Sequence, residues 1–285
     1  MRRHSILVPE AIPYAIEEDP YWAYVKDQDF DLGAAALAIG IPEYPDLDVP
    51  QFVAQLDHLG TLVRERVTPI TSPAERLRKL CEVLSVEAGL RGNEEDYYDP
   101  RNSYIHEVLE RRLGIPISLG VIYIEVGRRA GMRLQGIGAP SHFLVRSAEA
   151  DLYVDPYARG ALLDRQEAAR TVMQRNNGRL PAEQDPLPPV EGRQILVRVL
   201  SNLKRTYLER MDFEKALHVV NKLVILEPES PQEYRDRGVI NFQLELIPEG
   251  IADLERFLSL APQGPETRQV REQVSGLKRM LEMMR

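Results

Sequence analysis

Apolar residues in the first part of the chain recur at helical spacing and predict three amphipathic helices. The first covers 48–66 and begins after Asp48, which can cap it. The second begins at the capping-box sequence 72–75, and the third covers 102–113. The apolar residues expected to face inward are Phe52, Leu56, Leu59, Val63, Leu77, Leu80, Cys81, Leu84, Ile105, Val108, Leu109 and Leu113.

A fourth helix, at 119–129, is apolar nearly all round, so we expect it to be buried on most sides. Three short strands follow it, at 133–137, 142–146 and 152–155. The second and third strands are expected to form a hairpin around the polar loop 147–151. The pattern therefore predicts an α+β fold that is mostly helical, with a small antiparallel sheet packed on the central helix.

A segment rich in proline and glycine, 176–192, separates this part from a C-terminal repeat. Pro228 recurs as Pro262 after 34 residues, and the same offset relates Phe213 to Ile247. Paired helices at a 34-residue period are typical of tetratricopeptide repeats. The predicted organisation is a first domain at 1–175, a linker at 176–192, and an all-α repeat region at 193–285.

Helix-start signals support the repeat. Ser230 precedes Pro231 and a capping-box glutamate, Glu233, while Asp212 can cap the preceding helix. A last amphipathic helix after Pro265 is expected to cover the open end of the stack.

Composition excludes several classes of protein. The chain has 285 residues and a net charge of −8, and its basic and acidic residues balance after residue 190. Because no basic stripe is present, nucleic-acid binding is disfavoured.

Met1–Val8 is not followed by an apolar stretch, so neither a secretory signal nor a membrane span is predicted. Cys81 is the only cysteine, which excludes an internal disulfide and fits a reducing cytoplasm. Neither a metal site nor a cofactor is predicted.

Three polar residues fall where catalytic groups are placed in thiol enzymes. Ser118 stands at the start of the apolar helix, His142 opens one strand, and Asp155 ends the next. Nucleophile, histidine and aspartate in that order, on helix, strand and strand, is the layout of a papain-like or transglutaminase-like site.

Three stretches, 102–134, 140–146 and 153–160, together with the 34-residue repeat, resemble bacterial SirB-type proteins of the transglutaminase-like superfamily. These proteins join a transglutaminase-like core to C-terminal tetratricopeptide repeats. The resemblance implies a site derived from a Cys-His-Asp triad, in which His142 and Asp155 match the histidine and the aspartate. Ser118 is nearest to the cysteine position. Asn102 and Ser103 lie in the matching stretch and either cap their helix or line the cleft.

Each of these residues also has a structural interpretation. Ser118 is the expected N-cap of its helix, accepting from the amide of Gly120 or Val121. His142 fits a strand histidine bonded to a backbone carbonyl, and Asp155 fits the start of a turn. Cys81, in the middle of a helix, is expected to serve core packing.

A serine hydroxyl ionises far less readily than a thiol, so a helix terminus and an imidazolium activate it little. The first hypothesis is therefore a pseudoenzyme, a non-catalytic adaptor that binds a protein or peptide partner through its repeats and degenerate cleft. The alternative is a serine-dependent acyl transferase or amide or ester hydrolase that uses Ser118, His142 and Asp155.

Overall fold

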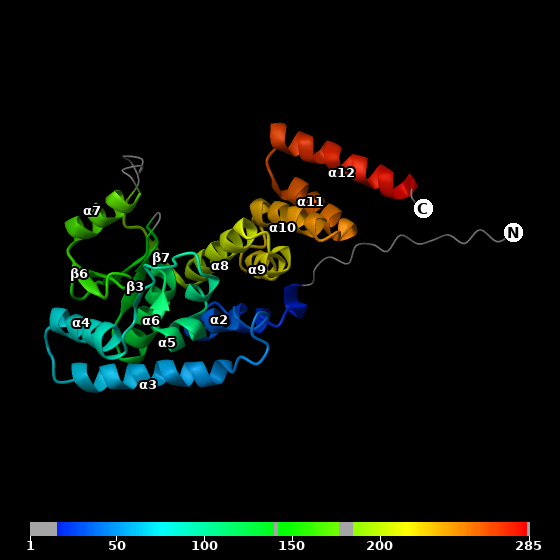
Figure 1. Cartoon of the computed structure of the whole chain (residues 1–285). Coiled ribbons are helices and arrows are strands. Elements are labelled where there is room, and N and C mark those ends of the chain that lie inside the picture. Colours follow the sequence, from blue (N-terminus) through cyan, green and yellow to red (C-terminus); the bar gives the residue numbers. More distant parts are fainter. Residues whose placement is uncertain (1–15, 140–141, 177–184, 284–285) are drawn as a thin grey trace. The chain divides into compact units, whose positions relative to one another are not determined.

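The computed structural model describes residues 16–139, 142–176 and 185–283. The chain forms two compact units. The first unit is Tyr24–Thr206. The second combines, among the described residues, 16–23 with 207–283. Figure 1 shows helices throughout the chain and one small sheet in the first unit.

The first unit is built around one buried helix, α6. Its helices are α2 (Leu32–Ala38), α3 (Val49–Val67), α4 (Pro73–Cys81), α5 (Ile105–Arg111), α6 (Pro116–Arg129), α7 (Arg165–Arg175) and α8 (Gly192–Glu209), of which α8 enters the second unit after Thr206. A π-helical turn, Glu82–Glu87, extends α4, and a 3-10 turn, Pro100–Asn102, precedes α5. A short helix α1 (Trp22–Val25) lies at the unit boundary.

A five-stranded antiparallel sheet packs on α6, in the order β6-β5-β4-β3-β7. The strands are β3 (Leu134–Ile137), β4 (Leu144–Ser147), β5 (Leu152–Asp155), β6 (Ala161–Leu163) and β7 (Pro189–Val190). A separate parallel pair, β1 (Arg91–Gly92) and β2 (Leu113–Gly114), lies just before α6. Glycine allows the close packing of helix on sheet, because a Cβ at Gly120 would lie 2.4 Å from the Phe143 ring.

The fold predicted from the sequence is confirmed: the unit is α+β, mostly helical, with a small antiparallel sheet. The predicted hairpin is β4 paired with β5, and Asp48 caps α3 by accepting from the Gln51 amide at 3.0 Å. The prediction missed α2, α7, β1, β2, β6 and β7. It also began the central helix three residues late, because Pro116 occupies the first helical position.

The second unit is helical. It contains α9 (Phe213–Leu226), α10 (Pro231–Gln243), α11 (Ile247–Leu260) and α12 (Pro265–Met283), and the N-terminal turn Ile16–Glu18. The starts of α9 and α11 reproduce the 34-residue offset seen in the sequence. Asp212 caps α9 at 3.3 Å as predicted. Ser230 is the N-cap residue of α10, but its side chain makes no cap hydrogen bond.

The helices of the second unit share an apolar core and one buried polar network. The core residues are Val224, Tyr234, Ile251, Leu254, Phe257, Val270 and Val274. Arg237 on α10 donates to both carboxylate oxygens of Asp253 on α11, at 2.6 and 2.9 Å. Asn241 donates to the same carboxylate at 2.9 Å. The network satisfies charges that would otherwise be costly to bury between the paired helices.

The unit boundaries differ from the predicted segments. The first unit extends through most of α8, whereas the predicted repeat region starts at residue 193. Residues 177–184 of the predicted linker lie outside the described residues. Near the N-terminus, Tyr21 belongs with the repeats, because its ring lies 5.5 Å from the ammonium group of Lys222 on α9.

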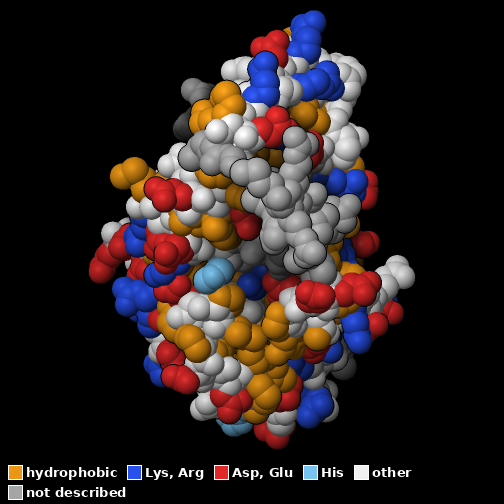
Figure 2. All heavy atoms as spheres, turned by 90° about the vertical axis from the view of Figure 1, so that its right-hand side faces the viewer, with side chains coloured by type: hydrophobic (Ala, Val, Ile, Leu, Met, Phe, Trp, Pro, Cys, Tyr) orange, Lys and Arg blue, Asp and Glu red, His pale blue; other side chains and the backbone are white. Residues whose placement is uncertain are grey.

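Two surface properties bear on the classes considered above. On the face drawn in Figure 2, basic and acidic side chains are intermixed. Among the residues that the structure describes, no helix is long and apolar enough to cross a membrane.

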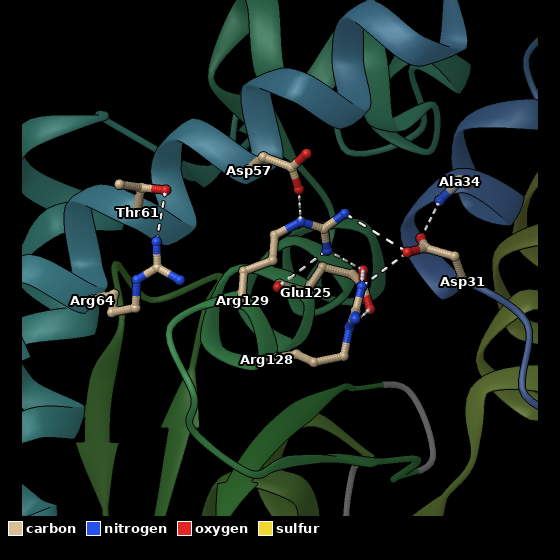
Figure 3. A network of polar contacts seen from close by, with 8 residues as sticks. All are labelled: Asp31, Ala34, Asp57, Thr61, Arg64, Glu125, Arg128 and Arg129. Carbon is tan, nitrogen blue, oxygen red and sulfur yellow. Dashed lines mark hydrogen bonds and ion pairs between the residues drawn. The ribbon is translucent and has the colours of Figure 1, made fainter.

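A polar network joins α6 to α2 and α3 (Figure 3). Its centre is Glu125, whose side chain is 2% exposed. Arg129 donates to Glu125 and, at 2.6 Å, to Asp57 on α3. Arg128 donates to Glu125 at 3.0 Å and to Asp31 at 2.9 Å. The two arginines differ in burial, since their side chains are 9% and 55% exposed.

This difference in burial predicts unequal stability effects. Arg129→Met should lower the free energy of unfolding by about 3 kcal/mol, because it removes the buried partner of a buried carboxylate. Arg128→Met, in the same network, should cost about 1 kcal/mol or less. Urea unfolding followed by circular dichroism measures both, and equal losses would contradict the view that Arg129 is the main buried partner of Glu125.

His106 lies in an apolar aromatic setting in the same unit. Its ring centroid is 4.4 Å from that of Tyr44 and 5.7 Å from that of Phe52. Neither ring nitrogen has a hydrogen-bond partner within the described part of the chain. Burial lowers the pKa of His106 below its usual range, with the charge of Glu107 opposing the shift.

A histidine with a lowered pKa makes stability depend on pH. The unfolded chain takes up the proton first, below its usual pKa of about 6.5, so stability should fall as the pH drops from about 7 to about 5. His106→Leu should reduce this fall. Unfolding free energies at several pH values test it, and an unchanged slope in the variant would count against a buried neutral imidazole.

Candidate functional site

His142 and Asp155 lie in contact at one end of the sheet, and we call them the His–Asp pair. His142 precedes β4 and Asp155 ends β5. The ring Nε2 lies 2.8 Å from the carboxylate Oδ2, with the side chains 0% and 3% exposed. Oδ1 accepts from the amides of Tyr157 and Ala158, each at 3.1 Å. The carboxylate therefore has partners on both oxygens.

The environment of the pair favours a charged carboxylate. Burial alone would raise the pKa of Asp155. Hydrogen bonding and charge from His142, and the Ala158 amide, outweigh burial and lower the pKa below its usual range. The other ring nitrogen, Nδ1 of His142, is buried and has no partner among the described residues.

Ser118 is fully buried and holds the start of α6. Its Oγ donates to the carbonyl oxygen of Asn102 at 2.5 Å and accepts from the amide of Ile115 at 3.1 Å. The prediction that Ser118 is the N-cap is wrong. Ile115 is the N-cap and Pro116 the first helical residue, so Ser118 is the third and bonds backward.

Ser118 lies on a different side of α6 from Gly120, the residue that packs against the segment next to His142. Gly120 faces the ring of Phe143, the neighbour of His142. The residues three and four positions before Gly120 lie on the same face of the helix, and they are Ile117 and Pro116. Neither carries a nucleophilic atom. The structure thus brings His142 and Asp155 together, while the Ser118 hydroxyl is bonded to backbone groups outside the pair.

Asn102 and Ser103 were expected to cap a helix or line the cleft. The cap expectation is wrong, because Tyr104 is the N-cap residue of α5. Asn102 instead organises the loop before it, donating to the Asp96 carbonyl at 2.7 Å and accepting from the Asn93 side chain at 3.0 Å. Ser103 is buried.

Arg198 on α8 is a site residue that the sequence did not reveal. Its guanidinium group donates to the carbonyl oxygens of Ala139 and His142, at 2.8 and 3.1 Å. Burial lowers the pKa of Arg198, with the charge of Tyr97 opposing. No local motif marks Arg198, and the sequence reading placed it in the repeat region.

The remaining candidate groups are structural. Cys81 is buried, as predicted for core packing, and burial raises the pKa of its thiol to about 12. Across residues 16–139, 142–176 and 185–283, no group of three or more His, Cys, Asp or Glu side chains is arranged to hold a metal ion.

Comparison with protein families matches two parts of the chain. Residues 50–201 match the family model of the transglutaminase-like superfamily. Residues 203–275 match a tetratricopeptide repeat model. The junction between the matches lies close to the boundary of the two units in the structure.

Several bacterial proteins are similar over most of the chain. A UPF0162 protein of Xylella fastidiosa (strain Temecula1) is 37% identical over 251 residues, which cover 85% of this chain and 89% of the relative. Protein SirB1 of Salmonella typhimurium is 29% identical, with 87% and 94% covered. UPF0162 protein YchA of Escherichia coli K12 is 24% identical, with 87% and 95% covered. No solved structure gives a significant match.

The contacts of Ser118 predict a structural role for its hydroxyl. Ser118→Ala should lower the free energy of unfolding by about 2 kcal/mol, because it leaves a buried amide and a buried carbonyl with fewer partners. Thr68→Ala, which removes an exposed hydroxyl bonded to the Arg64 carbonyl, should cost less than about 0.5 kcal/mol. Chemical denaturation measures both variants.

The wild-type protein and the Ser118→Ala variant also test whether Ser118 acts as a nucleophile. A fluorophosphonate probe should leave Ser118 unlabelled in the wild-type protein, because its hydroxyl is buried and bonded to backbone. Labelling that disappears in Ser118→Ala would overturn the structural role.

Proposed function

Because the chain belongs to the transglutaminase-like superfamily and carries tetratricopeptide repeats, we propose that it is a non-catalytic adaptor that binds a protein partner through its repeats. The observation that carries the proposal is the bonding of Ser118. With its hydroxyl committed to Asn102 and Ile115, the His–Asp pair has no activated nucleophile on the first turn of α6. Tetratricopeptide repeats typically present a concave binding surface.

Serine catalysis is the weaker alternative. It needs the hydroxyl within hydrogen-bond reach of an imidazole nitrogen, with room for a substrate beside it. The Ser118 side chain is fully buried and bonded to backbone groups, and both features weigh against attack on an amide or ester.

The repeat unit offers a defined surface for a partner. On α10, Gln232, Asp236, Val239 and Gln243 recur at helical spacing and lie along one face. Val239 is 51% exposed, whereas the opposite side of the helix carries the buried Arg237 and Tyr234. A polar face with one exposed apolar side chain at its centre fits the contact area for a peptide or helix of a partner.

A pair of matched substitutions tests the adaptor. Val239→Glu should reduce partner capture by the full-length protein from cell extract at least about tenfold, because it places a charge at the one apolar position of this face. Met211→Glu is the control, since Met211 is also exposed, at 74%, and lies outside α10. Quantitative mass spectrometry of the captured proteins provides the measurement.

Both substitutions are at exposed positions, so each should leave the melting temperature within about 2 °C of the wild type. If no protein is captured above background, or if Val239→Glu and Met211→Glu capture the same partner equally, then the repeats are not the adaptor surface.

A further inference from the structure

Three tyrosine rings form a row next to the His–Asp pair. Tyr157 follows Asp155 by two residues, and its ring centroid lies 6.1 Å from that of Tyr97. The centroids of Tyr97 and Tyr98 are 5.3 Å apart. The Tyr157 hydroxyl donates to the Asn93 carbonyl at 3.0 Å, which fixes one end of the row. Tyr98, at the other end, is 56% exposed.

An arginine borders each end of this row. The guanidinium carbon of Arg175, at the end of α7, lies 5.5 Å from the Tyr157 ring centroid. The guanidinium carbon of Arg205, on α8, lies 5.9 Å from the Tyr98 ring centroid. Both arginines are exposed, so their charges face solvent beside the rings.

A third arginine connects the row to the His–Asp pair. Arg198 lies about two turns before Arg205 on α8, and its guanidinium carbon is 5.9 Å from the Phe143 ring centroid. It also donates to the carbonyl of His142. All three arginines act on the phenol of Tyr97 and favour its ionised form, although burial acts more strongly and raises its pKa.

None of the three arginines is held in a direct ion pair within the described residues. In the part of the chain that the structure describes, Arg175, Arg198 and Arg205 form no ion pair with a carboxylate. The charges of two carboxylates, Glu94 and Asp155, act on Tyr157, and the charge of Arg175 acts on Asp155. Three arginines against two carboxylates leave a local excess of positive charge on a chain of net charge −8.

We propose that this arginine–tyrosine row (Arg175, Tyr157, Tyr97, Tyr98 and Arg205, with Arg198 beside it) binds the dianion of a phosphate monoester. A guanidinium fork matches phosphate oxygens in a bidentate way. Three cations also suit a dianion better than the single charge of a carboxylate. The tyrosine faces then pack against the group that carries the phosphate. The inference rests on the proposed function, because it assigns a ligand to a surface beside a His–Asp pair that catalysis does not use.

Isothermal titration with phenyl phosphate tests the site on the full-length protein. Arg175→Gln and Arg205→Gln should each weaken binding about tenfold, the effect of losing about 1.4 kcal/mol of charge-assisted hydrogen bonding. Arg170→Gln is the matched control, because Arg170 is an exposed arginine on the same helix as Arg175, outside the row. It should bind phenyl phosphate as the wild type does. Benzoate should bind at least about tenfold more weakly than phenyl phosphate.

Three results would overturn the proposal. One is no heat of binding with phenyl phosphate at about 10 mM, well above the affinity of a weak site. Another is equal binding by Arg170→Gln, Arg175→Gln and Arg205→Gln. The third is benzoate binding as tightly as phenyl phosphate.

The source of the phosphate is decided by a second titration. A phosphotyrosine peptide that binds more tightly than phenyl phosphate identifies a phosphorylated protein as the ligand. Equal or weaker binding identifies a free phosphate monoester. The test of the phosphate site is independent of the test of the adaptor, because Val239→Glu should leave phenyl phosphate binding unchanged. Phosphate binding without partner capture would contradict the adaptor proposal alone. Partner capture without phosphate binding would contradict the phosphate site alone.

Discussion

The hydrogen bonds of one buried hydroxyl, that of Ser118, set the start of α6, around which the first unit is built. A helix begins with amides that have no partner inside the helix, and a buried start needs those partners from elsewhere in the protein. Pro116 has no backbone N–H, so the helix start has one donor fewer to satisfy. The Ser118 hydroxyl accepts from the amide of Ile115. The proton of the hydroxyl reaches the Asn102 carbonyl, so the same atom also ties α6 to the turn that precedes α5.

That contact also limits the chemistry at the helix start. A thiol at a helix N-terminus gains from the local field, because its pKa lies close enough to neutrality to be shifted into the ionised range. A hydroxyl gains little from the field and depends on an aligned base. Here the hydroxyl is bonded to backbone groups, and the face of α6 that meets Phe143 presents Gly120 preceded by Ile117 and Pro116. Packing at this face is tight, and neither Ile117 nor Pro116 has a nucleophilic atom in its side chain.

Sequence periodicity predicted the long helices of this protein, because the apolar residues that a helix buries recur at its period. The apolar stripe of α3 and its Asp48 cap, and the repeat that relates Phe213 to Ile247, were all visible in the chain. Strands of two or three residues, such as β7, have too few positions to show alternation, and they form only because a neighbouring strand supplies hydrogen bonds. The position of Asn102 was misjudged for a similar reason, since its partners are loop carbonyls that no local pattern predicts.

The candidate site was predictable only in part. His142 and Asp155 could be paired from the order of strands, because adjacent antiparallel strands bring the end of one beside the start of the other. Arg198, 56 residues after His142, could not be found, because its role depends on how α8 packs on the sheet.

A His–Asp pair does not by itself indicate catalysis in this fold. Asp155 accepts from two amides of the turn that follows β5, so its carboxylate shapes that turn as well as holding the imidazole. Substituting either residue would leave the other buried without its hydrogen-bond partner. Such a change would lower the free energy of unfolding considerably, whether or not the pair takes part in catalysis. The pair therefore has a structural reason to be present without any nucleophile. The chemical feature that sets this site apart is the positive charge beside the pair, where Arg198 has only carbonyl oxygens as hydrogen-bond partners among the described residues.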